Sequence, residues 1–264
     1  MSFTDKVIWI TGASSGIGKH LAIECSNLNA KLILSSRNIE ALKAVKTLCK
    51  NPLNVKLITL DLEDYTTFKT KVTEAISCFG SIDILVNNGG ISQRSLAQET
   101  SIDVDKRIMD VNYLGSVALT KTLLPLFIEQ QSGHFVVTTS IVGKIGTPLR
   151  SSYAASKHAL HGFFDSLRAE IHTNNIAVTL VCPGFVNTNI SLNALTGNGK
   201  AQNKMDNATK NGLAPERFAQ LMAKAIYKKK QEVYIAGFKE KLGIYTKRFF
   251  PKLLSKMIRK LSVT

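Results

Sequence analysis

The sequence has no long apolar run, no secretory leader pattern and few cysteines. No segment reaches the roughly eighteen uninterrupted apolar residues that a membrane span needs. The N-terminal stretch MSFTDKVIWITG lacks a basic region followed by a long apolar one, so it does not resemble a secretory signal. Cys25, Cys49, Cys78 and Cys182 are widely spaced, with no CxxC motif and no Cys/His cluster. These absences predict a cytoplasmic protein with reduced thiols and no bound metal.

The sequence is also poor in acidic residues, and its positive charge is unevenly distributed. There are 19 Asp and Glu against 34 Lys and Arg, which gives a net charge of +15. From Ala223 to the end, 12 basic residues stand against 2 glutamates, a net of +10, so only +5 belongs to the rest of the chain. Nothing in this tail resembles a nucleic-acid recognition motif, and we expect no nucleic-acid partner.

Seven short apolar runs alternate with longer, mostly amphipathic stretches. The runs are apolar at consecutive positions, as in strands that are buried on both faces. They are KVIWIT, KLILSS, VKLITL, IDILVN, HFVVTTS, AVTLVC and EVYIA. The pattern predicts an α/β fold of three layers, with a parallel sheet of about seven strands between helices. We expect one domain over residues 1–237, with a mobile loop at 189–213, and a basic helical extension over 238–264.

A glycine-rich segment, TGASSGIG at residues 11–18, follows the first predicted strand. Gly12, Gly16 and Gly18 allow the backbone to approach a ligand, and the helix that follows presents unpaired N–H groups at its N-terminus. The alternative is a tight strand-to-helix turn without a ligand. Because a strand precedes the glycines and the helical pattern IGKHLAIEC overlaps their end, we favour a pyrophosphate-binding turn.

The second predicted strand ends in LSSRN, without an acidic residue. Dinucleotide-binding folds commonly place there either an acid for the ribose hydroxyls or a base for a 2′-phosphate. Ser36 and Arg37 follow the strand directly, and Lys19 is a possible second cation. Arginine can bind a phosphate through two parallel hydrogen bonds, so this position favours NADPH over NADH. The alternative is that Arg37 is a solvated surface residue.

Six motifs together resemble the short-chain dehydrogenase/reductase superfamily in its form of about 250 residues, over residues 4–236. They are TGASSGIG, NNGG from Asn87, Asn112 in DVNYLG, Ser140, YAASK from Tyr153 and PGFVNT from Pro183. The segment GKIGTPLRSSYAASKHALHGFFDSLRAE is most similar to the branch of the dehydrogenase/reductase member 7 proteins and their bacterial relatives. The resemblance implies a doubly wound Rossmann fold and an NAD(P)-dependent oxidoreductase.

Tyr153 and Lys157 lie four residues apart, one turn of helix, so a phenol and an ammonium project from the same face. An isolated YxxxK is usually a surface pair, but here Ser140 and Asn112 are in register with it. The resemblance implies that Tyr153 exchanges a proton with the substrate oxygen, while Lys157 stabilises the phenolate. It further implies that Ser140 holds that oxygen and that Asn112 anchors a water linking Lys157 to solvent.

The resemblance also implies a set of cofactor-binding residues. Asp61 and Leu62 would contact the adenine, Asn87 would brace the strand on the adenosine side, and Thr188 would bind the nicotinamide carboxamide. The others are Gly12, Ser14, Ser15, Gly16, Ile17, Gly18, Ser36, Arg37, Gly89, Pro183, Gly184 and Val186, with Tyr153 and Lys157. Where the family usually has NNAG this chain has NNGG, and we expect Gly89 to add backbone freedom without loss of function.

Three less regular segments, residues 92–95, 141–146 and 189–213, should surround the substrate at the carboxyl ends of the strands. Arg94 and Lys144 are the fixed charges near Ser140 in them, which favours a neutral or apolar carbonyl compound while leaving acidic substrates open. The preferred activity is NADPH-dependent carbonyl reduction. The alternatives are NAD-dependent alcohol oxidation and a sensor or scaffold without turnover. The resemblance implies a homodimer or homotetramer.

The basic tail has an amphipathic helical pattern. Its apolar positions on one face are Leu253, Leu254, Met257, Ile258 and Leu261, and its basic positions include Lys252, Lys256, Arg259 and Lys260. Such a helix could lie in the headgroups of an anionic membrane, on its inner face, with Tyr245, Phe249 and Phe250 as anchors. The alternative is that the apolar stripe packs on this protein or on a partner subunit.

Overall fold

The computed structural model describes residues 1–259. Residues 260–264 lie outside the described part of the chain, and Lys260 and Leu261 of the predicted tail helix lie there with them. Within residues 1–259, seven strands form one parallel sheet in the order β3-β2-β1-β4-β5-β6-β7. The strands are β1 (Val7–Thr11), β2 (Lys31–Ser36), β3 (Val55–Thr59), β4 (Ile84–Asn87), β5 (Gly133–Thr138), β6 (Ile176–Pro183) and β7 (Glu232–Ile235). They coincide with the seven predicted runs, and the doubly wound α/β fold is confirmed.

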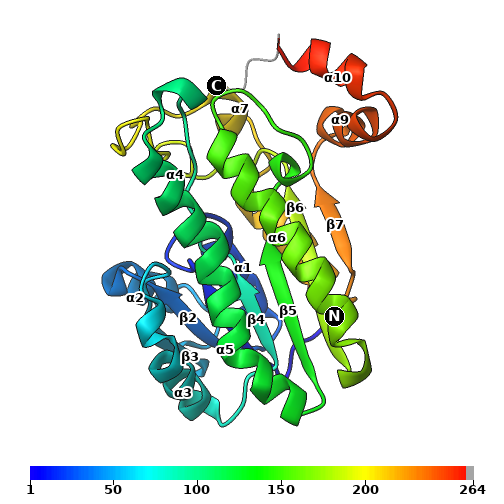
Figure 1. The fold of residues 1–264 in the computed structure, drawn as a ribbon. Coiled ribbons are helices and arrows are strands. Elements are labelled where there is room, and N and C mark those ends of the chain that lie inside the picture. The colour runs from blue at the N-terminus through cyan, green and yellow to red at the C-terminus, as the bar shows by residue number, and fades with distance from the viewer. Residues whose placement is uncertain (260–264) are drawn as a thin grey trace.

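Helices cover both faces of the sheet (Figure 1). The helices are α1 (Gly16–Asn27), α2 (Ile39–Thr47), α3 (Phe68–Phe79), α4 (Ile102–Met109), α5 (Gly115–Glu129), α6 (Ser151–Glu170), α7 (Asn207–Lys210), α8 (Pro215–Tyr227), α9 (Phe238–Phe249) and α10 (Pro251–Ile258). Along β1, Ile8 and Ile10 pack with side chains of α1, α2 and α8. Val7 and Trp9, which point the opposite way, pack with side chains of α3, α5 and α6. Burial on both faces is why the central strands β1 and β4 are apolar at consecutive positions, whereas the edge strand β3 has the exposed residues Lys56 and Thr59.

The helical stretch Ile102–Glu129 contains α4, a π-helical turn at Asp110–Leu114 and α5. It is long and apolar enough to cross a membrane, with a hydropathy of 1.3 in its most apolar window. However, 44% of that window is buried inside the protein, and Leu119, Leu123 and Phe127 of α5 pack in the core against the sheet. A core helix passes the same test of length and hydropathy.

The loop at 189–213 and the tail both pack partly against the rest of the protein. Within the loop, Ser191, Ala194, Asp206 and Thr209 are buried. The tail forms two helices rather than one, because α9 ends at Phe249 and Pro251 begins α10. Proline lacks the N–H that a continuing helix requires but fits a first helical turn. The predicted apolar face is divided, since Leu254 is buried whereas Leu253 and Met257 are half-exposed.

Candidate active site

The strand order reverses between β1 and β4, where such sheets open at the carboxyl ends of the strands. A cleft of about 580 Å³ lies there. Of the predicted cofactor residues it is lined by Gly12, Ser14, Ser15, Gly16, Ile17, Ser36, Arg37, Asp61, Leu62, Gly89, Tyr153, Lys157, Pro183, Gly184, Val186 and Thr188. Gly18 is not among the lining residues, and a Cβ there would lie 2.3 Å from the Gly12 carbonyl oxygen.

The turn between β1 and α1 is shaped to hold a phosphate group. Gly12 has a φ of +64°, and a Cβ there would lie 2.7 Å from the Gly89 Cα, so only glycine fits without strain. Ser15 occupies the N-cap of α1, but its side chain makes no capping hydrogen bond. The first N–H groups of α1 are therefore available to an anion, and the helix dipole favours one. These features fit a dinucleotide, and we call this the cofactor cleft.

Asn88, which sequence reasoning missed, braces the glycine turn. Its Nδ2 donates to the carbonyl oxygens of Thr11 (3.1 Å) and Gly12 (3.4 Å), and its Oδ1 accepts from Thr138 Oγ1 at 3.2 Å. The neighbouring Asn87 was the predicted residue, but it is not among those lining the cleft. Asn87 is buried and donates to Thr120 Oγ1 at 2.9 Å. Successive side chains of a strand point to opposite faces, which separates the two roles.

The end of the cleft at β2 carries two guanidinium groups. Arg37 and Arg107 both line it, whereas the predicted second cation, Lys19, does not. Glu63 lies 3.9 Å from Arg37 Nη1 and 3.4 Å from Arg107 Nε, so one carboxylate faces two positive charges. Asp61 accepts a hydrogen bond from the Glu63 backbone N–H at 3.1 Å, which fixes its carboxylate at the rim.

Three of the four predicted catalytic residues, Ser140, Tyr153 and Lys157, line the cleft, and Asn112 lies behind Gly90, which lines it too. Tyr153 and Lys157 lie one turn apart on α6, and Lys157 Nζ is 5.8 Å from the centre of the Tyr153 ring. Lys157 Nζ donates to the carbonyl oxygen of Thr138, the last residue of β5, at 2.8 Å. Ser140, two residues further along the chain, forms a side-chain hydrogen bond with Tyr153.

Burial perturbs the titration of this pair. It lowers the pKa of Lys157 to about 8. Burial also raises the pKa of Tyr153, while the hydrogen bond from Ser140 and the charges of Arg150 and Arg94 act in the opposite direction. The raised pKa keeps Tyr153 protonated but makes it a weaker acid, so the nearby cations, which stabilise the phenolate, are what allow it to give up its proton.

Asn112 lies in the π-helical turn between α4 and α5. Its Oδ1 accepts from the Ile91 N–H at 2.8 Å, and its Nδ2 donates to the Ile91 carbonyl oxygen and to Ser156 Oγ, both at 3.0 Å. A Cβ at Gly90 would lie 3.0 Å from Asn112 Oδ1 and 3.6 Å from Lys157 Nζ. Gly90 therefore keeps a narrow space between the two side chains, at the position where the predicted water would lie.

A second cavity, of about 1240 Å³, adjoins the catalytic residues. Both cavities are lined by Ser140 and Tyr153, so they meet where the reaction is expected. The three segments predicted to surround the substrate all contribute to its wall. Sequence reasoning did not anticipate the part of the wall that comes from α8, β7, α9 and Leu254 of α10.

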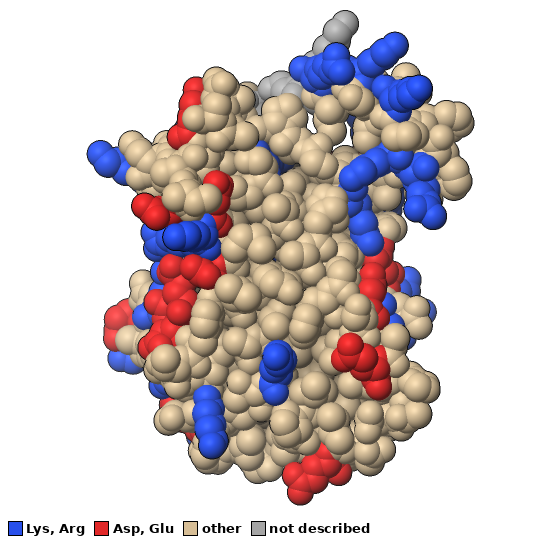
Figure 2. All heavy atoms as spheres, viewed as in Figure 1, with Lys and Arg blue, Asp and Glu red and all other residues tan. Residues whose placement is uncertain are grey.

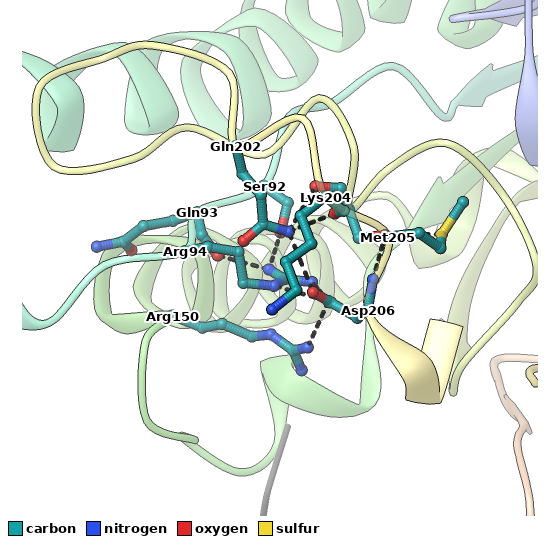
Figure 3. A network of polar contacts seen from close by, with 9 residues as sticks. Ser92, Gln93, Arg94, Arg150, Gln202, Lys204, Met205 and Asp206 are labelled. Carbon is teal, nitrogen blue, oxygen red and sulfur yellow. Dashed lines mark hydrogen bonds and ion pairs between the residues drawn. The ribbon is translucent and has the colours of Figure 1, made fainter. Parts of the chain in front are cut away.

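A buried charge cluster lies beside the second cavity (Figure 3). Asp206, from the 189–213 loop, accepts hydrogen bonds from Arg94 Nε at 2.8 Å and Nη2 at 2.5 Å, and Arg150 Nη2 lies 3.5 Å away. Gln202 Nε2 donates to the other carboxylate oxygen of Asp206 at 3.1 Å. All three charged side chains are buried, so Asp206 holds the loop against two arginines near Tyr153.

Gln93 supports the start of the catalytic helix. Its Oε1 accepts from the backbone N–H groups of Ser152 (2.9 Å) and Tyr153 (3.4 Å), whereas the N-cap residue Arg150 makes no side-chain cap. Because the first N–H groups of a helix lack partners within it, Gln93 acts as a cap from a distant segment. It thereby fixes the turn that carries Tyr153.

Comparison with known proteins agrees with this geometry. The family model for short chain dehydrogenase matches residues 6–198, and the chain belongs to that family of oxidoreductases. It is 42% identical over 259 residues to dehydrogenase/reductase SDR family member 7B of Bos taurus, covering 96% of this chain and 80% of the relative. The predicted family and branch are thus confirmed.

Solved structures agree in fold. A short chain dehydrogenase/reductase of Burkholderia phymatum in complex with NAD superposes with a TM-score of 0.82 at 23% identity, covering 96% of each chain. Levodione reductase superposes with a TM-score of 0.78 at 27% identity, covering 90% of this chain and 98% of its own. The family acts on hydroxyl and carbonyl groups with nicotinamide nucleotides, which matches a cofactor cleft that ends at a tyrosine.

Proposed function

We propose that this protein reduces an aldehyde or ketone to an alcohol with NADPH. The observation that carries the proposal is the meeting of the two cavities at Ser140 and Tyr153. One cavity fits a dinucleotide, and the other is large enough for a substrate. A carbonyl carbon at the junction would have a proton donor on one side and the end of the cofactor cleft on the other.

The residues have separate roles in this reaction. NADPH, when bound, supplies the hydride. Ser140 holds the carbonyl oxygen by a hydrogen bond, and Tyr153 donates the proton to it. Lys157 is positively charged when protonated and lies close enough to stabilise the phenolate left on Tyr153. The space beside Gly90 and Asn112 gives a path by which a water could return the proton.

The two arginines at the β2 end support a preference for NADPH. Arg37 and Arg107 face the cleft where the 2′-phosphate of NADPH would lie, and the strand ends without an acid. Glu63 supports the alternative, an alcohol dehydrogenase that uses NAD, because its carboxylate partly neutralises both guanidinium groups. Two cations against one carboxylate leave a net positive charge, which favours the phosphate.

The test compares NADPH and NADH oxidation across aldehydes, ketones, steroids and 3-oxoacyl thioesters, with the Tyr153→Phe variant and Tyr227→Phe as a surface control. We expect faster turnover with NADPH and a loss of roughly 10²- to 10⁴-fold in Tyr153→Phe only. Replacing Arg37 with alanine should weaken NADPH binding about tenfold and leave NADH binding unchanged. Tight NADPH binding without turnover of any compound would replace this proposal with the sensor or scaffold role.

A cytoplasmic location and a homo-oligomeric state belong to the same proposal. Free thiols at Cys25, Cys49, Cys78 and Cys182 support a reducing compartment. Cell fractionation tests the location, and light scattering of the purified protein tests the oligomer. Recovery in an oxidising compartment would contradict the cytoplasmic location, and a monomeric mass would contradict the homo-oligomeric state.

A further inference from the structure

The outer side of α9 and α10 is both apolar and basic, and we call it the C-terminal face. Its exposed apolar side chains are Leu242, Tyr245, Phe249, Phe250, Leu253 and Met257. Residues 238–259 contain seven Lys or Arg and one acid, Glu240, a net charge of +6. Figure 2 shows Lys and Arg atoms gathered over these two helices, with uncharged surface between them. So many exposed apolar side chains in one place indicate a binding surface.

The inner side of the same helices is already occupied. Leu254 packs with Ile141, Ile145 and Cys182 in a small core of its own. The one acid of the segment, Glu240, is also turned inward, and it accepts a hydrogen bond from the Phe185 N–H at 2.9 Å. These contacts hold the two helices in place and leave the other apolar side chains of α9 and α10 exposed.

The break between the helices shapes the face. Phe250 leaves the helical conformation, with a φ of −133°, and Pro251 starts α10. Phe249 and Phe250 therefore lie at the corner between the two helices, 69% and 65% exposed. Aromatic side chains at a projecting corner, with lysines on either side of it in the chain, are typical of segments that lie in the interface of a bilayer.

We propose that the C-terminal face docks on an anionic phospholipid bilayer. Phe249 and Phe250 enter the headgroup region, and Lys252 and Lys256 approach the lipid phosphates. The charge of the face favours this occupant over a second copy of the chain, because two such faces would meet with the same positive charge. Docking also places the mouth of the second cavity beside the bilayer, since α9 and Leu254 form part of its wall.

The test is co-sedimentation of the full chain with vesicles of phosphatidylcholine, alone or mixed with phosphatidylglycerol. We expect binding to the mixed vesicles only, weakened by added salt. Phe249→Ser with Phe250→Ser should abolish it. Lys252→Gln with Lys256→Gln should weaken it about 25-fold, because each lysine near an anionic surface contributes roughly fivefold.

Two control variants match these changes elsewhere on the surface. Leu53→Ser removes an apolar side chain that is 85% exposed, and Lys69→Gln with Lys121→Gln removes two exposed lysines from α3 and α5. Both should bind vesicles as the unchanged protein does. The proposal is overturned if mixed vesicles are not bound, if the controls weaken binding equally, or if the phenylalanine variant loses only a dimer in size-exclusion chromatography.

Discussion

The cofactor cleft and the second cavity share Ser140 and Tyr153, but the molecule builds them in different ways. The cleft is made mostly by short segments at the ends of neighbouring strands, and its close contacts involve backbone and glycines. The second cavity depends on side chains from distant parts of the chain, among them Arg94, Arg150 and Asp206. The cofactor cleft should therefore be sensitive to substitutions that alter the backbone, and the second cavity to substitutions that remove a charge.

The largest effect is expected from Asp206→Asn beside the second cavity. The substitution removes the carboxylate of the buried Arg94–Asp206 pair and leaves the Arg94 charge buried, which should lower the free energy of unfolding by about 3 kcal/mol. The measurement is denaturant unfolding. The pH profile of turnover should also move to lower pH, because the positive charges of Arg94 and Arg150 favour ionisation of Tyr153 and the negative charge of Asp206 no longer opposes them.

The control for this variant is Asp165→Asn. Asp165 pairs with Arg168 Nη1 at 2.6 Å, but its side chain is 50% exposed. Exposed pairs contribute at most about 1 kcal/mol, so the control should change stability little. Equal losses in the two variants would contradict the claim that burial of charge organises this cavity.

In the cofactor cleft the substitution that corresponds to Asp206→Asn is Gly12→Ala. It imposes a left-handed conformation on alanine, which costs roughly 1–2 kcal/mol, and it presses a Cβ against the Gly89 Cα. NADPH binding, followed by fluorescence titration, should weaken at least about tenfold. Gly80→Ala is the control, because Gly80 also has a positive φ, +81°, but nothing lies within 4 Å of its added Cβ. If Gly80→Ala weakens NADPH binding as much, the close contact is not the cause.

Acid should destabilise the central sheet, which supports both the cofactor cleft and the second cavity. His134 on β5 is buried and contacts Thr179 Oγ1 on β6 at 2.8 Å, and burial lowers its pKa to about 3. Between pH 6.5 and about 3 the unfolded chain binds a proton that the folded chain does not, so stability falls as the pH falls through this range. The loss is about 1.4 kcal/mol per pH unit. In His134→Gln the slope of stability against pH should be smaller by this amount, and an unchanged slope would exclude His134 as the cause.

The smallest effect is expected at Gly89, where the family usually has alanine. In Gly89→Ala the one contact of the new Cβ that is too close is with the tip of Leu62, which can rotate away, so activity should change by less than about twofold. In Gly90→Ala it meets Asn112 Oδ1, which the Ile91 N–H holds in place, so turnover should fall several-fold. Rates measured at saturating NADPH compare the two, and a larger loss in Gly89→Ala would reverse this assignment.

The contrast between a cleft made of short consecutive segments and a cavity made of distant side chains explains what could be predicted from the sequence. Tyr153 and Lys157 could be found because their spacing is local, and the glycine turn because strand, glycines and helix are consecutive. Asp206 and Arg94 are 112 residues apart, and no local pattern indicates that they meet. Asn88 was not found because the sequence does not show which of two neighbouring side chains faces the cleft. Similarly, Leu254 looked like one member of an apolar stripe, and only the packed structure separates it from Leu253.

The order of the elements along the chain has a consequence for how the protein is made. Every residue that lines the cofactor cleft precedes Ala201, whereas part of the wall of the second cavity comes from residues 238–254. During synthesis the ribosome therefore releases the nucleotide-binding half well before the last part of the wall. The segment that completes the wall of the substrate cavity, α9 with Leu254 of α10, is thus made after every residue that contacts the cofactor cleft.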